Sequence, residues 1–205
     1  MAGYVFNFQV DLGKEDGHVE QYLTRREVKH LILPIENIFH HLYMNTFYCD
    51  HHLFLELERK QVLACGTIRA NQKIFPRDIV LTAAMETRMD RVDYICRWYE
   101  NLVTLASYGG RSVYLIPTVH PPESIGEPTT VQCRSASGAR QPIPCPPAQS
   151  NYQGFMDGAA LADQIQQRFS VIRRSNKTWK KVFYYGLKVC LLNSFTILKK
   201  VRQTP

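Results

Sequence analysis

The chain has 205 residues, 45% apolar and 11% aromatic, a composition typical of a folded domain with a core, which excludes a disordered protein. We expect no cleaved signal peptide, because residues 1–9 carry no positive region followed by a long apolar run. We expect no membrane span, because the most apolar late stretch, residues 182–198, is interrupted by Lys188 and Asn193. The net charge of +7 is uneven: residues 168–205 hold ten basic and no acidic side chains, so residues 1–167 sum to −3. Such a block favours a polyanion as partner, with a solvated basic helix face as the alternative.

Strand and helix patterns alternate through the first third of the chain. Apolar residues at every second position predict strands, and apolar residues at helical spacing predict helices. Thr24 with Glu27 three residues later forms a capping-box pattern, which predicts the start of the first helix. The expected elements are a strand at 4–12, a turn at 13–17, a helix from 24 to near Pro34, a strand at 38–44, a helix at 51–60 and a strand at 62–68. This order predicts an α/β layer with crossover connections.

The pattern changes after residue 69. The expected elements are strands at 94–99, 102–107 and 112–116, an irregular connection over 121–150, and helices at 152–169 and 178–200. The short strands predict a small antiparallel β unit, and seven prolines predict the irregular connection. In the last helix, with Thr178 as N-cap, one face is expected to gather Phe183, Leu187, Cys190, Leu191 and Ile197, away from Lys180, Lys181, Lys188 and Lys199.

Cysteine and histidine patterns do not favour a metal site. The six cysteines include no Cys-x-x-Cys pair, so we expect scattered, reduced thiols. His40-His41 and His51-His52 flank a Cys-Asp dipeptide, but alternation along a strand places His40 and His41 on opposite faces. Partly exposed histidines are therefore favoured over a metal cluster. We expect no metal ion and no other cofactor.

Four segments, taken in chain order, resemble those of one known family. They are Asn45-Thr46-Phe47-Tyr48-Cys49-Asp50 at a strand end, Cys65-Gly66-Thr67-Ile68-Arg69-Ala70-Asn71-Gln72-Lys73, Met156-Asp157-Gly158-Ala159-Ala160-Leu161-Ala162-Asp163-Gln164, and Lys177-Thr178-Trp179 with Asn193-Ser194-Phe195. Each segment is weakly specific by itself. Together, in this order over residues 4–200, they resemble the piggyBac transposase family.

The resemblance implies an RNase H-like catalytic core. The expected fold class is α/β: a partial RNase H-like core, interrupted by a small antiparallel β insertion and followed by C-terminal helices. The implied boundaries are 1–69 for the first part of the core, truncated at its N-terminus, 70–145 for the β-rich insertion and Pro-rich connection, and 146–205 for a core-completing helix and a basic C-terminal helix. The resemblance also implies a DNA-binding and dimerisation region and a first core strand before Met1, and a zinc module after the last helix.

The resemblance further implies phosphoryl transfer by two divalent ions that three aspartates hold. Carboxylates suit Mg²⁺ because they supply negative charge. The first aspartate would lie before Met1, the second matches Asn45, and the third matches Ala160. Asp163 matches a later Asp of the third motif, and Asp157, six residues earlier on a helix, points to a different side. We therefore expect no catalytic residue, no bound metal and no enzymatic activity.

The basic C-terminal segment is the candidate binding surface. The expected DNA contacts are Arg168, Arg173, Arg174, Lys177, Lys180 and Lys181, with Trp179 as a core anchor of its helix. The leading hypothesis is a domesticated, catalytically inactive transposase-derived protein that binds DNA or chromatin with little sequence preference, in the nucleus and secondarily in the cytoplasm. The alternatives are a protein-interaction module that forms homo- or hetero-oligomers, a remnant with no nucleic-acid role, and an active nuclease.

Overall fold

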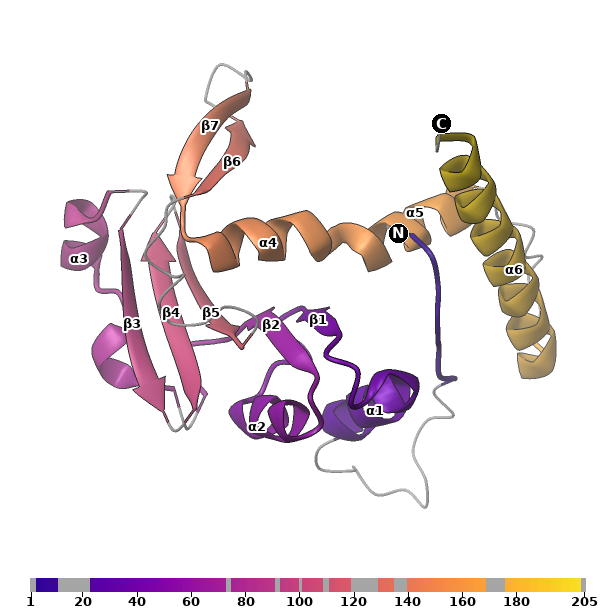
Figure 1. The fold of residues 1–205 in the computed structure, drawn as a ribbon, viewed down its shortest axis with the longest axis horizontal. Helices are drawn as coiled ribbons and strands as arrows, with labels where there is room; N and C mark the ends of the chain where they lie inside the picture. The colour runs from indigo at the N-terminus through magenta and orange to yellow at the C-terminus, as the bar shows by residue number, and fades with distance from the viewer. Residues whose placement is uncertain are drawn as a thin grey trace. The chain divides into compact units, whose positions relative to one another are not determined.

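The computed structural model describes nine stretches of the chain, which are residues 3–10, 23–72, 75–90, 93–99, 101–108, 111–118, 129–134, 140–168 and 176–203. The chain forms two compact units. The core unit comprises residues 24–154, and the helical unit comprises residues 1–23 together with residues 155–205. Figure 1 shows the ribbon from the N-terminal segment in indigo to the last helix in yellow.

The core unit alternates helices and strands before a run of strands. Its elements are α1 (Leu23–Ile32), the 3₁₀ turn η1 (Leu33–Ile35), β1 (His41–Met44), α2 (His51–Arg59), β2 (Leu63–Thr67), η2 (Arg77–Ile79), α3 (Ala83–Arg88), β3 (Tyr94–Tyr99), β4 (Leu102–Tyr108), β5 (Ser112–Pro117), β6 (Thr129–Arg134), β7 (Arg140–Cys145) and α4 (Pro147–Phe155). The predicted strand–helix–strand order β1–α2–β2 is confirmed. The first helix gives way to η1 at Pro34, as expected, because proline cannot continue the hydrogen-bond ladder of a helix.

One five-stranded sheet organises the core unit, in the order β1-β2-β5-β4-β3 (Figure 1). β1 and β2 are parallel, with Tyr43 paired to Cys65 and Met44 to Gly66, and α2 is their crossover connection. The other neighbours are antiparallel. The three later strands were expected to form a small β unit of their own. They are antiparallel as predicted, but they extend the parallel pair into a single sheet because β5 pairs with β2.

The sheet is covered on both faces. Alternate residues along each strand point to opposite sides, so one face packs against α2 through Leu53, Phe54 and Leu57, all of which are buried. The other face carries Cys65 and Leu105 among its buried residues and packs against Tyr152 of α4. Three layers of this kind give the α/β architecture that the sequence predicted.

The segment 121–150 is more regular than expected where the structure describes it. β6 and β7 form an antiparallel hairpin in which Pro142 lies opposite Gln132 and Pro144 lies opposite Thr130. A two-stranded ribbon tolerates these prolines because alternate N–H groups point away from the partner strand. The prediction of an irregular connection was therefore wrong for this part. The prediction counted the prolines and did not consider that Pro142 and Pro144 are two residues apart, which places them on the same side of a strand.

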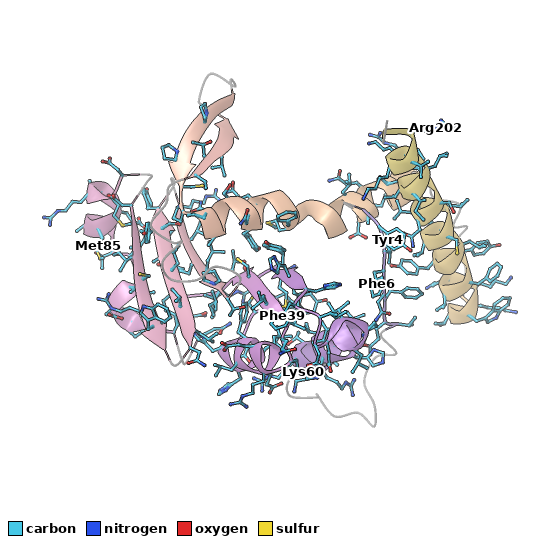
Figure 2. All side chains as sticks on the ribbon, viewed as in Figure 1. Tyr4, Phe6, Phe39, Lys60, Met85 and Arg202 are labelled. Atoms are coloured by element: carbon cyan, nitrogen blue, oxygen red, sulfur yellow. The ribbon has the colours of Figure 1, made fainter. Side chains whose placement is uncertain are left out.

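The helical unit contains α5 (Asp157–Arg168), α6 (Thr178–Gln203) and an N-terminal segment, residues 3–10. Residues 4–10 are not a strand, although alternation predicted one; residues 11–12 and the expected turn at 13–17 lie outside the described residues. The backbone N–H of Val5 donates to Asn193 Oδ1 at 2.8 Å, and Asn193 Nδ2 donates to the Val5 carbonyl at 2.8 Å. Phe8 packs edge to face on Tyr185. Figure 2 marks Tyr4 and Phe6 on this segment.

Three helix predictions need correction. The single helix expected at 152–169 is divided into α4, which already begins at Pro147, and α5, with Met156 as a turn between them. Proline suits the first turn of a helix because its missing N–H is not needed there. Thr24 is not the N-cap of α1, since Leu23 is already helical. The last helix, expected at 178–200, extends from Thr178 to Gln203, but Thr178 is already helical and the Lys177 carbonyl accepts from the Lys181 N–H, so Thr178 is not its N-cap.

Candidate functional site

The carboxyl ends of the parallel strands β1 and β2 gather polar side chains in the core unit. Thr46, just after β1, and Thr67, at the end of β2, bring their hydroxyl oxygens within 2.7 Å of each other. The Tyr152 hydroxyl of α4 lies 3.2 Å from the Thr67 hydroxyl. Sequence reasoning missed this hydroxyl chain, because its members lie 21 and 85 residues apart. This series of hydroxyl groups connects the ends of β1 and β2 to α4.

Asn45, the first residue after β1, is exposed beside this hydroxyl chain. Its side-chain Oδ1 accepts a hydrogen bond from the Phe47 backbone N–H at 3.0 Å, which forms an Asx turn after the strand. The amide supplies an oxygen but no negative charge. The local role of Asn45 is therefore to shape the chain between β1 and α2.

Asp50, at the N-cap position of α2, is engaged in an ion-pair cluster. The Arg25 guanidinium of α1 contacts the Asp50 carboxylate and also lies 3.9 Å from the Glu56 carboxylate, which in turn contacts Lys29. These pairs tie α1 to α2 on the same side of the sheet. The Asp50 carboxylate is thus compensated by a cation of the same unit, which argues against its use as a metal ligand.

His51, the first residue of α2, is buried, contrary to the expected partial exposure. Burial lowers the pKa of His51, an effect that the neighbouring Asp50 partly offsets. Burial likewise raises the pKa of the Cys65 thiol to about 12 and raises the pKa of Cys49 further. Both thiols are therefore protonated at neutral pH. Within the described stretches, no three His, Cys, Asp or Glu side chains are grouped closely enough to hold a metal ion.

The positions expected to match the family's third motif lie on α5 in the helical unit. Ala160 and Asp163 are both helical, and the Asp163 carboxylate is exposed. Six residues separate Asp157 from Asp163, which corresponds to about 240° around the helix axis, so these two positions do not share a face. Asn45 belongs to the core unit, whereas Ala160 and Asp163 belong to the helical unit.

The predicted DNA contacts fall at the end of α5 and the start of α6. Arg168 is exposed in the last turn of α5, and Arg173 and Arg174 lie outside the described residues. Lys177 and Lys181 are exposed, while Lys180 is half-buried.

The prediction that Trp179 anchors α6 in a core was wrong, because the Trp179 side chain is 64% exposed. The Lys180 ammonium lies 5.6 Å from the centre of the Trp179 ring, within the range of a cation–π contact.

A basic stripe along α6 extends beyond the predicted DNA contacts, which include only its first member, Lys181. Successive helical residues are about 100° apart, so Lys181, Lys188, Lys199 and Arg202 fall within a sector of about 60°. Of these, Lys188 is half-buried and the other three are exposed. Arg202 lies in the last turn of α6 (Figure 2). A helical projection of residues 178–203 would have found the stripe.

The sheet and the helices that follow it agree with one known class of fold. A mixed α/β sheet of this topology, followed by C-terminal helices, is consistent with the RNase H-like domain of DDE transposases. A family model described as "Transposase IS4" matches residues 1–195. The chain belongs to this family of DDE transposases, in its piggyBac branch.

Two relatives support the assignment. The human protein named PiggyBac transposable element-derived protein 5 is 23% identical over 150 residues, which are 72% of this chain and 27% of that protein. A solved structure, the cryo-EM structure of a piggyBac transposase synaptic complex with hairpin DNA, is similar over 97% of this chain with a TM-score of 0.74 and 19% identity. The chain covers 38% of that structure's chain. Among the described helices, none has the length and apolar character to cross a bilayer.

Proposed function

We propose that this chain is a domesticated, catalytically inactive transposase-derived protein that associates with DNA or chromatin in the nucleus through its basic C-terminal segment. The observation that carries the proposal is the row of five lysines and one arginine on α6, a helix without a single acidic residue. The solved relative, a piggyBac transposase in a synaptic complex with hairpin DNA, is consistent with it.

The loss of catalysis rests on two replaced positions. Two-metal phosphoryl transfer needs several carboxylates around closely spaced divalent ions. By resemblance, the family's second and third aspartates correspond to Asn45 and Ala160, which supply a neutral amide and a methyl group. Asp50 is compensated by Arg25, so it does not replace either of them.

Restoring one acid is therefore expected to leave the chain inactive. Asn45→Asp should fold normally, because an Asp Oδ1 can accept the same bond from the Phe47 N–H, and should not cleave a hairpin-ended duplex or a supercoiled plasmid in Mg²⁺ or Mn²⁺. Strand cleavage is followed on denaturing gels beside a thermal melt of each variant. Metal-dependent cleavage by the wild-type chain that disappears in Asp163→Ala would overturn the proposal of inactivity.

DNA association follows from the charge on the start of α6. Each lysine that contacts a phosphate releases condensed counterions, so the affinity falls with salt by a slope of about −0.9 per contact. Phosphate contacts of this kind carry little sequence information. Exposed or half-exposed cations at Lys177, Lys180 and Lys181 meet this requirement at one end of the helix.

The double variant Lys180→Glu/Lys181→Glu is expected to reduce the salt slope for a random 30-base-pair duplex by about 2, with binding at 50 mM salt weakened at least about tenfold. Fluorescence anisotropy in a salt series from 50 to 200 mM KCl measures both quantities. The matched control is Arg88→Glu/Arg111→Glu, which changes the net charge equally at two exposed positions of the core unit.

The control should change the slope by less than one contact. No binding by the wild-type chain at low salt, or equal losses in both double variants, would contradict a DNA surface on α6.

A second candidate function, a protein-interaction module, is favoured by the exposed apolar side chains on the same helix.

A further inference from the structure

The side of α6 that faces outward in the helical unit is apolar. α6 packs inward through Val189 and Leu192, which are buried, and through Asn193, which is bonded to Val5. At about 100° per residue, these three positions and the basic stripe occupy one half of the helix circumference. The other half should be polar if water covered it. Apart from Lys180, which was predicted to lie away from this side, and Ser194, it carries mainly large apolar side chains instead.

The exposed side chains of this outward face form a long row. They include Phe183 at 56%, Leu191 at 64% and Val201 at 65% relative exposure. Single exposed apolar residues are ordinary, but a contiguous row on one helix marks an interaction surface. We call this row the outward face of α6, and its members are Trp179, Phe183, Leu187, Cys190, Leu191, Ile197, Leu198 and Val201.

The spacing within the outward face favours another helix as its occupant. The series Phe183, Leu187, Cys190, Ser194, Ile197 and Val201 alternates steps of four and three residues, all six exposed. Alternating steps of four and three add up to a seven-residue repeat, the repeat with which two helices pack knobs into holes. From Phe183 to Val201 the series covers about 27 Å of helix axis, or about two and a half heptads.

Charge distinguishes between the possible partner helices. α6 carries six basic residues, which are Lys180, Lys181, Lys188, Lys199, Lys200 and Arg202, and no Asp or Glu. A second copy of α6 would bring another acid-free basic helix alongside, so like charges would face each other across the flanks of the seam. A helix with acidic residues at its flanking positions would instead pair with the basic stripe.

We propose that the outward face of α6 is the docking surface for an amphipathic helix of another protein, with apolar residues at coiled-coil spacing and acidic residues beside them. This proposal names the binding site and the kind of partner for the protein-interaction module, the second candidate function given above. It can be tested separately from DNA binding, because truncating the apolar side chains leaves the cations of α6 in place. Cys190, exposed within the face, provides a local reporter.

The test uses the full chain and two synthetic 28-residue helical peptides. Both have Leu and Ile at the seam positions, and they differ only in Glu or Lys at the flanking positions. We expect the Glu peptide to bind the chain and to slow the reaction of Cys190 with a maleimide, identified by mass spectrometry of the labelled fragment. Leu187→Ala/Leu191→Ala should weaken this binding at least about 30-fold, because two side chains lose most of their burial.

Leu33→Ala, which truncates an exposed leucine of the core unit, is the matched control and should bind the peptide normally. The Leu187→Ala/Leu191→Ala variant should also retain the salt slope of DNA binding, so the two proposals fail separately.

No binding of the Glu peptide, or equal binding of the Lys peptide, would overturn the proposal. Protection of Cys190 that rises with the concentration of the chain alone would also overturn it, because it would show that a second copy covers the face. Binding to anionic lipid vesicles without binding to the peptide is the fourth contradicting result.

Discussion

Gly66→Ala is expected to lower the free energy of unfolding of the core unit by about 2–3 kcal/mol, because it overpacks the carboxyl end of the parallel strand pair. A methyl group at this position of β2 would collide with the Cys49 sulfur and would lie 2.9 Å from the Met44 carbonyl oxygen and 3.4 Å from the Phe54 ring. The sulfur ends a short side chain that is itself buried, and the carbonyl belongs to β1. Neither neighbour can withdraw without moving the strand or the start of α2.

A double-mutant cycle separates the two collisions. Cys49→Ala removes the sulfur, so Cys49→Ala/Gly66→Ala should recover part of the loss but not the part that arises from the Met44 carbonyl. Gly154→Ala in α4 is the matched control: an added methyl group there meets nothing within 4 Å, and alanine is the better helix former. Urea unfolding followed by far-UV circular dichroism gives the free energies. A Gly66→Ala chain as stable as the Gly154→Ala chain would contradict the close packing of β1, β2 and α2.

Phe54→Ala is expected to cost about 3–5 kcal/mol, the larger of the two effects. The Phe54 ring is 0% exposed on the inner side of α2, in contact with the face of the sheet that carries Ala64 and Ala106. Removing it leaves a cavity between the helix and strands that cannot collapse without shifting the crossover connection. The structure of the strand ends, where Asn45 and Thr46 lie, should therefore be lost together with stability.

Phe47→Ala removes the same side chain from a position that is 65% exposed. It gives up only an edge-to-face contact with Tyr48, whose ring centre is 5.1 Å away, so the loss should be below about 1 kcal/mol. Thermal and urea unfolding of both variants provide the comparison. Similar losses for the two phenylalanines would show that α2 is not packed on the sheet as described.

Local pattern was sufficient for much of the core unit. β3 was placed at its observed bounds and β1, α2, β2, β4 and β5 within a few residues, because alternation and helical spacing record which side of each element meets the core. Alternation misled at residues 4–10, where Asn193 satisfies the Val5 backbone that a neighbouring strand would otherwise bond. The β6–β7 hairpin was missed because prolines were weighed one by one.

The residues of the candidate sites were likewise predicted from the sequence only in part. Motif order placed Asn45 after a strand and Asp163 on a helix, as observed. The pairing of Thr46 with Thr67 and Tyr152 could not be anticipated, because it depends on β1 lying beside β2 and on α4 crossing them. The role of Trp179 was also decided by packing: its helix position was right, but which side of α6 is covered depends on residues far away in the sequence.

By itself, the sequence indicated the family, and it determined the α/β order and the basic, acid-free character of residues 168–205. These features are properties of residue type and spacing, which need no partner to be recognised. Only the tertiary structure decided that β3–β5 join the parallel pair, that Arg25 compensates Asp50, and that α6 leaves its apolar face exposed. Burial and pairing are relations between distant segments, and they exist only once the chain has folded.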